Sequence, residues 1–219
     1  MKFLIFLGST RASTPPRPER LGLRVSRACE YFFKLIDEKH SIEIIDPLDY
    51  EQGPVFKPHF SYAKSRAPKD LQSLAEKIQA AHGYVMVSPE YNHSMSPALS
   101  HLLNHFGSSL FSYKPSAIVT YSAGQWGGTR AAMGMRSFLS ELGCLPVSAM
   151  VHVPFAQQVL NEEGLILDEA EETQWQSYFA RAFNQLSWWA QAAQSQTQCL
   201  DPHDMIQSFT KDPSQRNAP

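Results

Sequence analysis

The sequence has few cysteines, and none of them are paired at metal-ligand spacing. Cys29, Cys144 and Cys199 lie far apart and form no C-x-x-C motif. An odd, scattered set of thiols argues against a disulfide framework and against a zinc site. We interpret the three residues as reduced thiols that are buried or incidental.

Long runs of one charge and long apolar runs are also missing. The 19 basic and 21 acidic side chains nearly balance, and no basic run forms, so neither nucleic acid nor a membrane is expected as the main partner. The apolar stretch at residues 3–7 is too short for a signal-peptide core or a membrane span. We therefore expect a cytoplasmic protein, and any anion that it binds should be small.

Several common site signatures are absent. The turn after the first apolar run holds one glycine, Gly8, instead of G-x-G-x-x-G, and no G-x-x-x-x-G-K-[ST] occurs. A resident dinucleotide or a P-loop nucleotide is therefore disfavoured, and Asp46 is interpreted as a turn or cap residue. Ser94 and Ser122 lack the G-x-S-x-G context of a hydrolase nucleophile.

What the sequence does contain is a regular alternation of apolar and amphipathic segments. Buried strands are predicted at residues 3–7, 41–47, 83–89, 116–122 and 145–153. Helices are predicted at residues 21–39, 71–78, 99–106, 132–142 and 175–189. Parallel strands need crossover connections and bury both faces, so we predict a doubly wound α/β fold, with a five-stranded parallel sheet and helices on both faces.

The length of 219 residues suits one such domain. From residue 195 the chain becomes rich in Gln, Ser, Asp and Pro and loses its period. We expect the folded domain to cover residues 1–194 and residues 195–219 to form a polar, mobile tail.

Ligands of such sheets bind beyond the carboxyl ends of the strands, so the loops there are the places to search. The loop after the first strand combines hydroxyls, arginines and the start of the next helix, which together suit a monophosphate. Its polar residues are Ser9, Thr10, Arg11, Ser13, Thr14, Arg17, Arg20 and Arg24. Taken alone, it is equally well explained as a solvated, proline-rich loop.

The loops after the third and fourth strands read PEYNHSMSP and SAGQWGGTR. Gly124, Gly127 and Gly128, around Trp126, would let the backbone approach a flat ligand. Together with the first loop, these segments suit a planar ring that carries one phosphate. Flavin mononucleotide (FMN) has that shape.

These loops give the chain a resemblance to the NAD(P)H-dependent FMN reductase family of flavodoxin-like quinone, azo and chromate reductases. The resemblance rests on the segments GSTR (8–11), RLGLRV (20–25), PEYNHS (89–94) and YSAGQWGGTRAA (121–132). It implies an enzyme that holds FMN, takes electrons from NADPH or NADH and passes them to a small acceptor. It also implies a homodimer with FMN near the subunit interface.

The resemblance assigns roles to particular residues. The first loop would bind the FMN phosphate, the PEYN loop would line the isoalloxazine ring, and the glycine loop would cover its other side. The residues so implied are Ser9, Arg11, Arg20, Pro89, Glu90, Tyr91, Asn92, Ser122, Gly124, Gly127 and Gly128. No catalytic acid or base is expected, because the cofactor carries the chemistry.

Two features leave alternatives open. His101 and His105 stand at i and i+4 with His93 nearby, but they lack the glutamate of H-E-x-x-H and a further ligand, so we expect no metal site and interpret them as surface or interface histidines. Trp175 and Trp189 belong either to the core or to an interaction face. The latter would suit a flavin-binding redox sensor or electron carrier instead of an enzyme.

Overall fold

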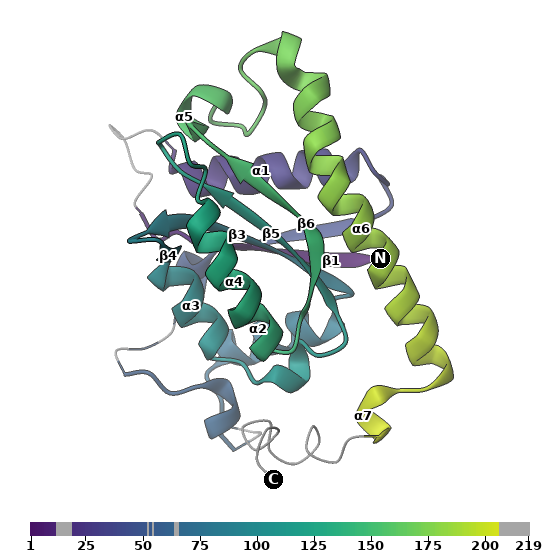
Figure 1. Ribbon diagram of the computed structural model, residues 1–219. Coiled ribbons are helices and arrows are strands. Elements are labelled where there is room, and N and C mark those ends of the chain that lie inside the picture. The colour runs from purple at the N-terminus through teal and green to yellow at the C-terminus, as the bar shows by residue number, and fades with distance from the viewer. Residues whose placement is uncertain (12–18, 52, 54, 64–65, 206–219) are drawn as a thin grey trace.

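The computed structural model describes residues 1–11, 19–51, 53, 55–63 and 66–205 (Figure 1). Its centre is a sheet of five parallel strands in the order β2-β1-β3-β5-β6. The strands are β1 Lys2–Leu7, β2 Ser41–Ile45, β3 Gly83–Tyr91, β5 Pro115–Tyr121 and β6 Leu145–Val153. A short sixth strand, β4 Ser94–Met95, pairs antiparallel with the end of β3. The predicted doubly wound sheet is confirmed.

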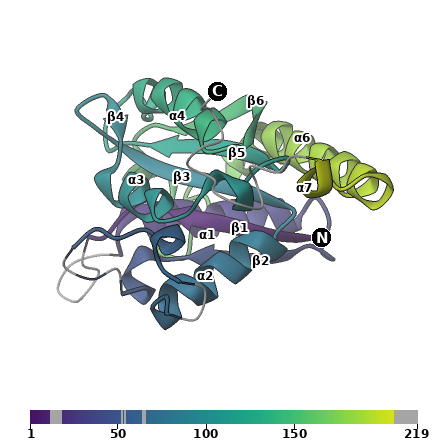
Figure 2. The ribbon, with the colours of Figure 1, turned by 90° about the horizontal axis from the view of Figure 1, so that it is seen from below.

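Helices cover both faces of this sheet (Figures 1 and 2). The helices are α1 Leu21–Lys34, α2 Lys69–Ala80, α3 Pro97–Asn104, α4 Thr129–Glu141, α5 Ala156–Val159, α6 Glu172–Cys199 and α7 Pro202–Met205, and the short 3-10 helices are Pro47–Asp49, His59–Ser61, Ser108–Leu110 and Glu169–Glu171. α1 and α6 pack on one face, and α2, α3 and α4 pack on the other. α1 ends at Lys34, before the predicted end at residue 39, and the Asp37 carboxylate accepts the backbone N–H of Lys39 in the turn that follows.

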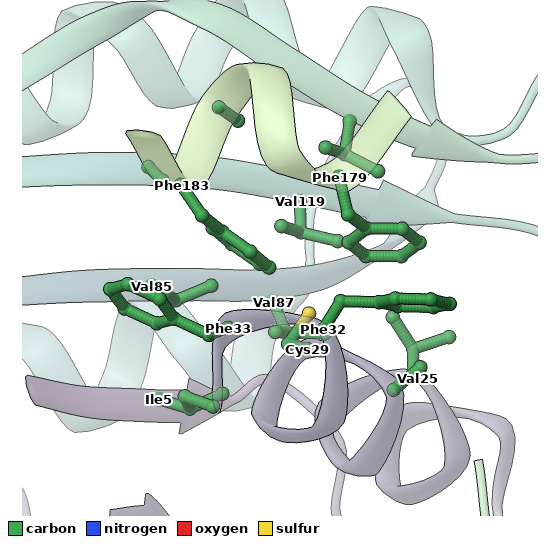
Figure 3. Close-up of a cluster of buried hydrophobic side chains, with 14 of the residues drawn as sticks. Ile5, Val25, Cys29, Phe32, Phe33, Val85, Val87, Val119, Phe179 and Phe183 are labelled. Carbon is green, nitrogen blue, oxygen red and sulfur yellow. The ribbon is translucent and has the colours of Figure 1, made fainter. Parts of the chain in front are cut away.

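Aromatic stacks join α1 to α6 over one face of the sheet (Figure 3). Phe32 stacks on Phe179 with ring centroids 4.7 Å apart, and Phe33 stacks on Phe183 at 4.8 Å. Cys29 lies fully buried beside them, and this burial raises the pKa of its thiol. Cys144 is buried and Cys199 is exposed, and all three cysteines are free thiols, as predicted.

A buried serine begins α3 on the opposite face. The Ser96 hydroxyl accepts a hydrogen bond from the backbone N–H of Leu99. The backbone N–H of Ser96 donates to the Ser88 hydroxyl. We expect Ser96→Ala to lower the free energy of unfolding by about 1 kcal/mol, because an N-cap acceptor is lost. Urea unfolding of the apoprotein measures this. Ser100→Ala, a change at a partly buried position on the same helix, is the control; an equal loss there would contradict the capping role.

β6 is the last strand at one side of the sheet, so its alternate backbone groups face away from β5. Side chains of α4 and α6, and not another strand, bond those groups. Arg136 of α4 donates to the carbonyls of Val147 and Ser148. From α6, Gln185 accepts the N–H of Ala149, Arg181 donates to the carbonyl of Met150, and Tyr178 accepts the N–H of His152. These outward polar groups are thus satisfied within the chain.

The segment after β6 folds back against α1. Leu160 and Ile166 form an antiparallel bridge, and Arg24 of α1 donates to the carbonyl of Leu160 and to the carboxylate of Glu162. Gly164, in the turn between the bridged residues, has a φ of 84°. A Cβ there would lie 2.6 Å from the carbonyl oxygen of Arg24. The close approach of this turn to α1 therefore requires glycine.

The last long helix extends past the predicted domain boundary at residue 194. α6 continues to Cys199, and the amide of Gln194 lies 3.0 Å from the Nε2 atom of His82. The prediction that regular structure ends at residue 194 is therefore wrong. Polar side chains such as Gln194 contact the rest of the chain there, although the apolar period of the helix has stopped. The rest of the expected tail, residues 206–219, lies outside the described residues.

The tryptophans of α6 differ in their surroundings. Trp175 packs against the core, whereas Trp188 and Trp189 are 63% and 43% exposed. The core interpretation therefore holds for Trp175 and fails for Trp189. In the part of the chain that the structure describes, no helix combines the length and the apolar character that crossing a bilayer demands.

Candidate cofactor-binding site

A cleft of about 610 Å³ opens where β1, β3 and β5 end. Its size falls in the range of small-molecule sites. The residues that line it are Ser9, Arg11, Glu19, Arg20, Leu21, Pro89, Glu90, Tyr91, Tyr121, Ser122 and Ala123. They come from the three loops that the sequence singles out. The carboxyl ends of the strands therefore form one site, as expected for this sheet.

The cleft includes most of the residues that the family resemblance implies. Those that line it are Ser9, Arg11, Arg20, Pro89, Glu90, Tyr91 and Ser122. Asn92, Gly124, Gly127 and Gly128 are not among the lining residues, and their contact with a ligand stays a prediction. Sequence reasoning missed Glu19, Leu21, Tyr121 and Ala123, each of which is a direct neighbour of Arg20 or Ser122.

The Arg20 side chain is paired with other groups of the protein. Its guanidinium donates to the carbonyl of Ser9 at 2.6 Å and forms an ion pair with Asp46, and both side chains of that pair are largely buried. Asp46 also accepts the N–H of Leu48 and so caps a 3-10 helix, which confirms its interpretation as a turn or cap residue. Arg20 thus fixes the first loop to the end of β2.

Arg11 is exposed and reaches toward the second loop. Its guanidinium carbon lies 5.7 Å from the centroid of the Tyr91 ring. Leu21, the first residue of α1, also lines the cleft, and the first turn of α1 contains no acidic residue. The Arg11 charge and the positive end of α1 therefore both favour an anion. Ser13, Thr14 and Arg17, which are further polar residues of the first loop, lie outside the described residues.

Tyr121 joins the first loop to the end of β5. Its side chain is 4% exposed and its hydroxyl is hydrogen-bonded to the Ser9 side chain. Burial raises the pKa of Tyr121, so the phenol stays protonated. A Cβ on Gly22 of α1 would lie 2.6 Å from the Tyr121 hydroxyl oxygen and 2.9 Å from the Cβ of Ser9. The absent side chain at residue 22 lets these two residues meet.

Glu90 links the second loop to α4. Its carboxylate accepts the backbone N–H groups of Arg130 and Ala131 at 3.1 and 3.3 Å, and the Arg130 guanidinium lies 3.7 Å away. A carboxylate at this position accepts hydrogen bonds from backbone N–H groups of the first turn that have no partner within the helix. Its negative charge also interacts favourably with the positive end of the helix dipole. Glu90 therefore both lines the cleft and holds α4 in place.

We expect Glu90→Gln to lower the free energy of unfolding by about 1 kcal/mol, because the amide keeps an acceptor but loses the charge. Urea unfolding at low and high salt measures this, and the loss should shrink as salt rises. Glu163→Gln, a change in an exposed turn, is the control. A loss that does not depend on salt would contradict the electrostatic explanation.

The tip of the second loop is a two-residue hairpin turn between β3 and β4. Asn92 and His93 have φ values of 51° and 62°. Asparagine tolerates this left-handed region better than most residues, and two such residues in sequence are typical of a type I′ hairpin. Local backbone geometry therefore gives a structural reason for asparagine at residue 92.

Local structure also explains two of the three loop glycines. Gly127 and Gly128 have φ values of 56° and 80°, and a Cβ on Gly128 would lie 2.8 Å from the Cβ of Thr120. At Gly124, by contrast, no atom in the described part of the chain, apart from the two neighbouring residues, lies within 4 Å of the Cβ position. Neither φ nor packing requires glycine at residue 124, so its small size leaves open space beside the loop. Trp126, in the same loop, is 59% exposed.

The histidines of α3 lie apart from the cleft. His101 is exposed, but His105 is fully buried, so its interpretation as a surface residue is wrong. The apolar face of α3 packs on the sheet and takes His105 inward. Burial, followed by the neighbouring His101, lowers the pKa of His105. Among the described residues, no group of three or more His, Cys, Asp or Glu side chains could hold a metal ion.

The strand order and the position of the cleft define a flavodoxin-like α/β protein. Among solved structures, the fold is similar to that of FerB, a flavoenzyme NAD(P)H:(acceptor) oxidoreductase from Paracoccus denitrificans. The TM-score is 0.64 at 15% identity, and the match covers 85% of this chain and 97% of that one. Residues 1–158 match the family model of NADPH-dependent FMN reductase, and the chain belongs to this family.

Two curated relatives give the sequence similarity. An NADPH azoreductase of Bacillus sp. (strain OY1-2) is 34% identical over 107 residues, which cover 49% of this chain and 58% of that protein. An NAD(P)H-dependent FMN reductase of Pseudomonas aeruginosa is 32% identical over 106 residues, covering 47% and 57% respectively. The chain thus spans little more than half the length of the curated relatives that it matches.

Proposed function

We propose that this chain is an FMN-dependent NAD(P)H oxidoreductase. It takes electrons from NADPH or NADH and passes them to a small acceptor such as a quinone, an azo compound, a metal oxyanion or free flavin. The observation that carries this proposal is the cleft at the strand ends, in which an anion-favouring end adjoins an aromatic wall. Membership in the NADPH-dependent FMN reductase family supports the choice of cofactor and donor.

The residues that line the cleft fit FMN. The Arg11 guanidinium and the start of α1 favour a phosphate, and Tyr121 is hydrogen-bonded to Ser9 of the first loop. Pro89 and Tyr91, whose ring centroid lies 5.7 Å from the Arg11 guanidinium carbon, offer flat surfaces against which a planar ring can lie. When bound, FMN supplies the hydride and electron transfer. The chain's own residues bind and orient it, and none is required to move a proton.

We also propose that the protein is a cytoplasmic homodimer. Trp126 and Met133 are each 59% exposed, and both lie beside or just after the glycine loop. Arg130 of α4 places its guanidinium 5.2 Å from the centroid of the Trp126 ring. An exposed aromatic residue next to the cleft suits a second copy that covers the bound cofactor. Light scattering of the purified protein measures the mass in solution.

An absorption spectrum and a turnover assay test the proposed function. Purified protein should be yellow, or should become yellow when FMN is added and excess is removed. It should then oxidise NADPH or NADH only when a quinone or another acceptor is present. Failure to retain FMN would overturn the proposal. Retention of FMN without turnover would assign the chain to the flavin-binding sensors or carriers instead.

A further inference from the structure

Two histidine side chains meet at the end of α3, away from the proposed FMN cleft. His101 lies in the last turn of the helix, and His105 is its C-cap residue. Their Nε2 atoms are 3.4 Å apart, and the ring planes are perpendicular. The two nitrogens therefore face one another across a short gap.

The length of this gap is at the long end for a hydrogen bond between two imidazoles, and it also suits two ligands of one metal ion. An N–H donor normally lies about 2.7–3.2 Å from its acceptor, so 3.4 Å is long for a proton held between two imidazoles. Two nitrogens bound to a tetrahedral zinc ion, with Zn–N bonds of about 2.0–2.1 Å, lie about 3.3–3.4 Å apart. The observed separation matches the edge of that tetrahedron.

The surroundings hold both rings in this arrangement. His105 is fully buried, and its imidazole lies close to the backbone of Lys57. The ring of Phe56 packs against both imidazoles, with centroids 4.8 Å from His105 and 5.6 Å from His101. The Lys57 ammonium is drawn over the Tyr62 ring, 4.1 Å from its centroid. The paired nitrogens are thus oriented before any ligand arrives, and His101 keeps the pair open to solvent.

We propose that His101 and His105 form a two-histidine site for Zn²⁺. Imidazole is a preferred ligand of zinc, and two residues at i and i+4 lie on one side of a helix. Water would complete the coordination, because no third side-chain ligand joins the pair among the described residues. The site is therefore open, and its affinity should fall in the micromolar range instead of the much tighter range of four-ligand structural zinc sites.

Zinc titration of the full-length, tag-free protein tests the proposal. Isothermal calorimetry with ZnCl₂ should show one ion bound per chain, and a Co²⁺ titration should produce the visible absorption of tetrahedral coordination. His101→Gln removes one ligand at an exposed position and should weaken zinc binding about tenfold or more. His93→Gln, in the exposed hairpin turn, is the matched control and should leave binding unchanged.

Absence of stoichiometric zinc binding in the wild-type protein would overturn the proposal. Equal affinity in the wild type and in His101→Gln would also overturn it. Circular dichroism of both variants checks that they are folded. The site does not depend on the proposed function, and the flavin absorption spectrum should be the same in His101→Gln and in the wild type.

Discussion

Replacing Gly22 with alanine is expected to weaken FMN binding about tenfold or more, which corresponds to about 1.4 kcal/mol. The new Cβ would lie 2.6 Å from the hydroxyl oxygen of Tyr121 and 2.9 Å from the Cβ of Ser9. The Tyr121 hydroxyl is hydrogen-bonded to the Ser9 side chain, so the added Cβ would push apart two residues that are bonded to each other. The first loop must therefore move away from β5, and the proposed phosphate end of the cleft would lose its shape.

Fluorescence titration of the apoprotein with FMN measures this affinity, and urea unfolding reports any separate loss of stability. Gly134→Ala makes the same change in a helix, at a position where no described atom outside the adjoining helix backbone lies within 4 Å of the Cβ. It should leave FMN affinity unchanged and raise the free energy of unfolding by about 0.5–1 kcal/mol, because alanine favours the helix. Unchanged affinity in Gly22→Ala would place the phosphate elsewhere.

The largest loss of stability is expected for Gly164→Ala, at about 2–4 kcal/mol. A side chain at a φ of 84° costs about 1–2 kcal/mol, and overpacking adds about 1–3 kcal/mol. The added Cβ would meet backbone atoms, the carbonyl oxygen of Arg24 at 2.6 Å and the amide nitrogen of Ala28 at 2.7 Å. Neither can move without shifting α1, so the turn must detach or the helix must tilt.

Gly53→Ala separates the two contributions. Gly53 has a φ of 73°, but no atom of the residues that the structure describes lies within 4 Å of its Cβ position. Urea unfolding should therefore show a loss of about 1 kcal/mol there, from the backbone alone. The difference between the two variants measures the contact of the turn with α1. Equal losses at both positions would show that this contact contributes nothing.

Much of the fold could be predicted because buried parallel strands are nearly continuous apolar runs. β1 and β6 match the predicted ranges to within one residue. Helix ends were harder to predict, since the chain after α1 turns through a side-chain contact of Asp37 and α6 continues past a side-chain contact of Gln194. Such contacts join residues by their side chains and leave no period in the sequence.

The candidate site, like the fold, could be predicted only in part. The three loops were predictable because the carboxyl ends of parallel strands share one edge of the sheet. The roles of individual residues in these loops could not be predicted. Tyr121 ends an apolar strand, and its sequence context does not separate a core residue from one at the cleft. Glu90 finds its partners in the first turn of α4, and only the crossover connection brings those amides to it.

The side chains that cover the outer edge of β6 also restrict how copies of this chain can associate. A strand from another molecule would have to displace Arg136, Gln185 and the other edge contacts before it could pair there. Extension of the sheet across β6, as in edge-to-edge aggregation or fibril growth, is therefore blocked on this side. An assembly that uses this side of the molecule must form through helix or loop surfaces, and it can dissociate without breaking the sheet.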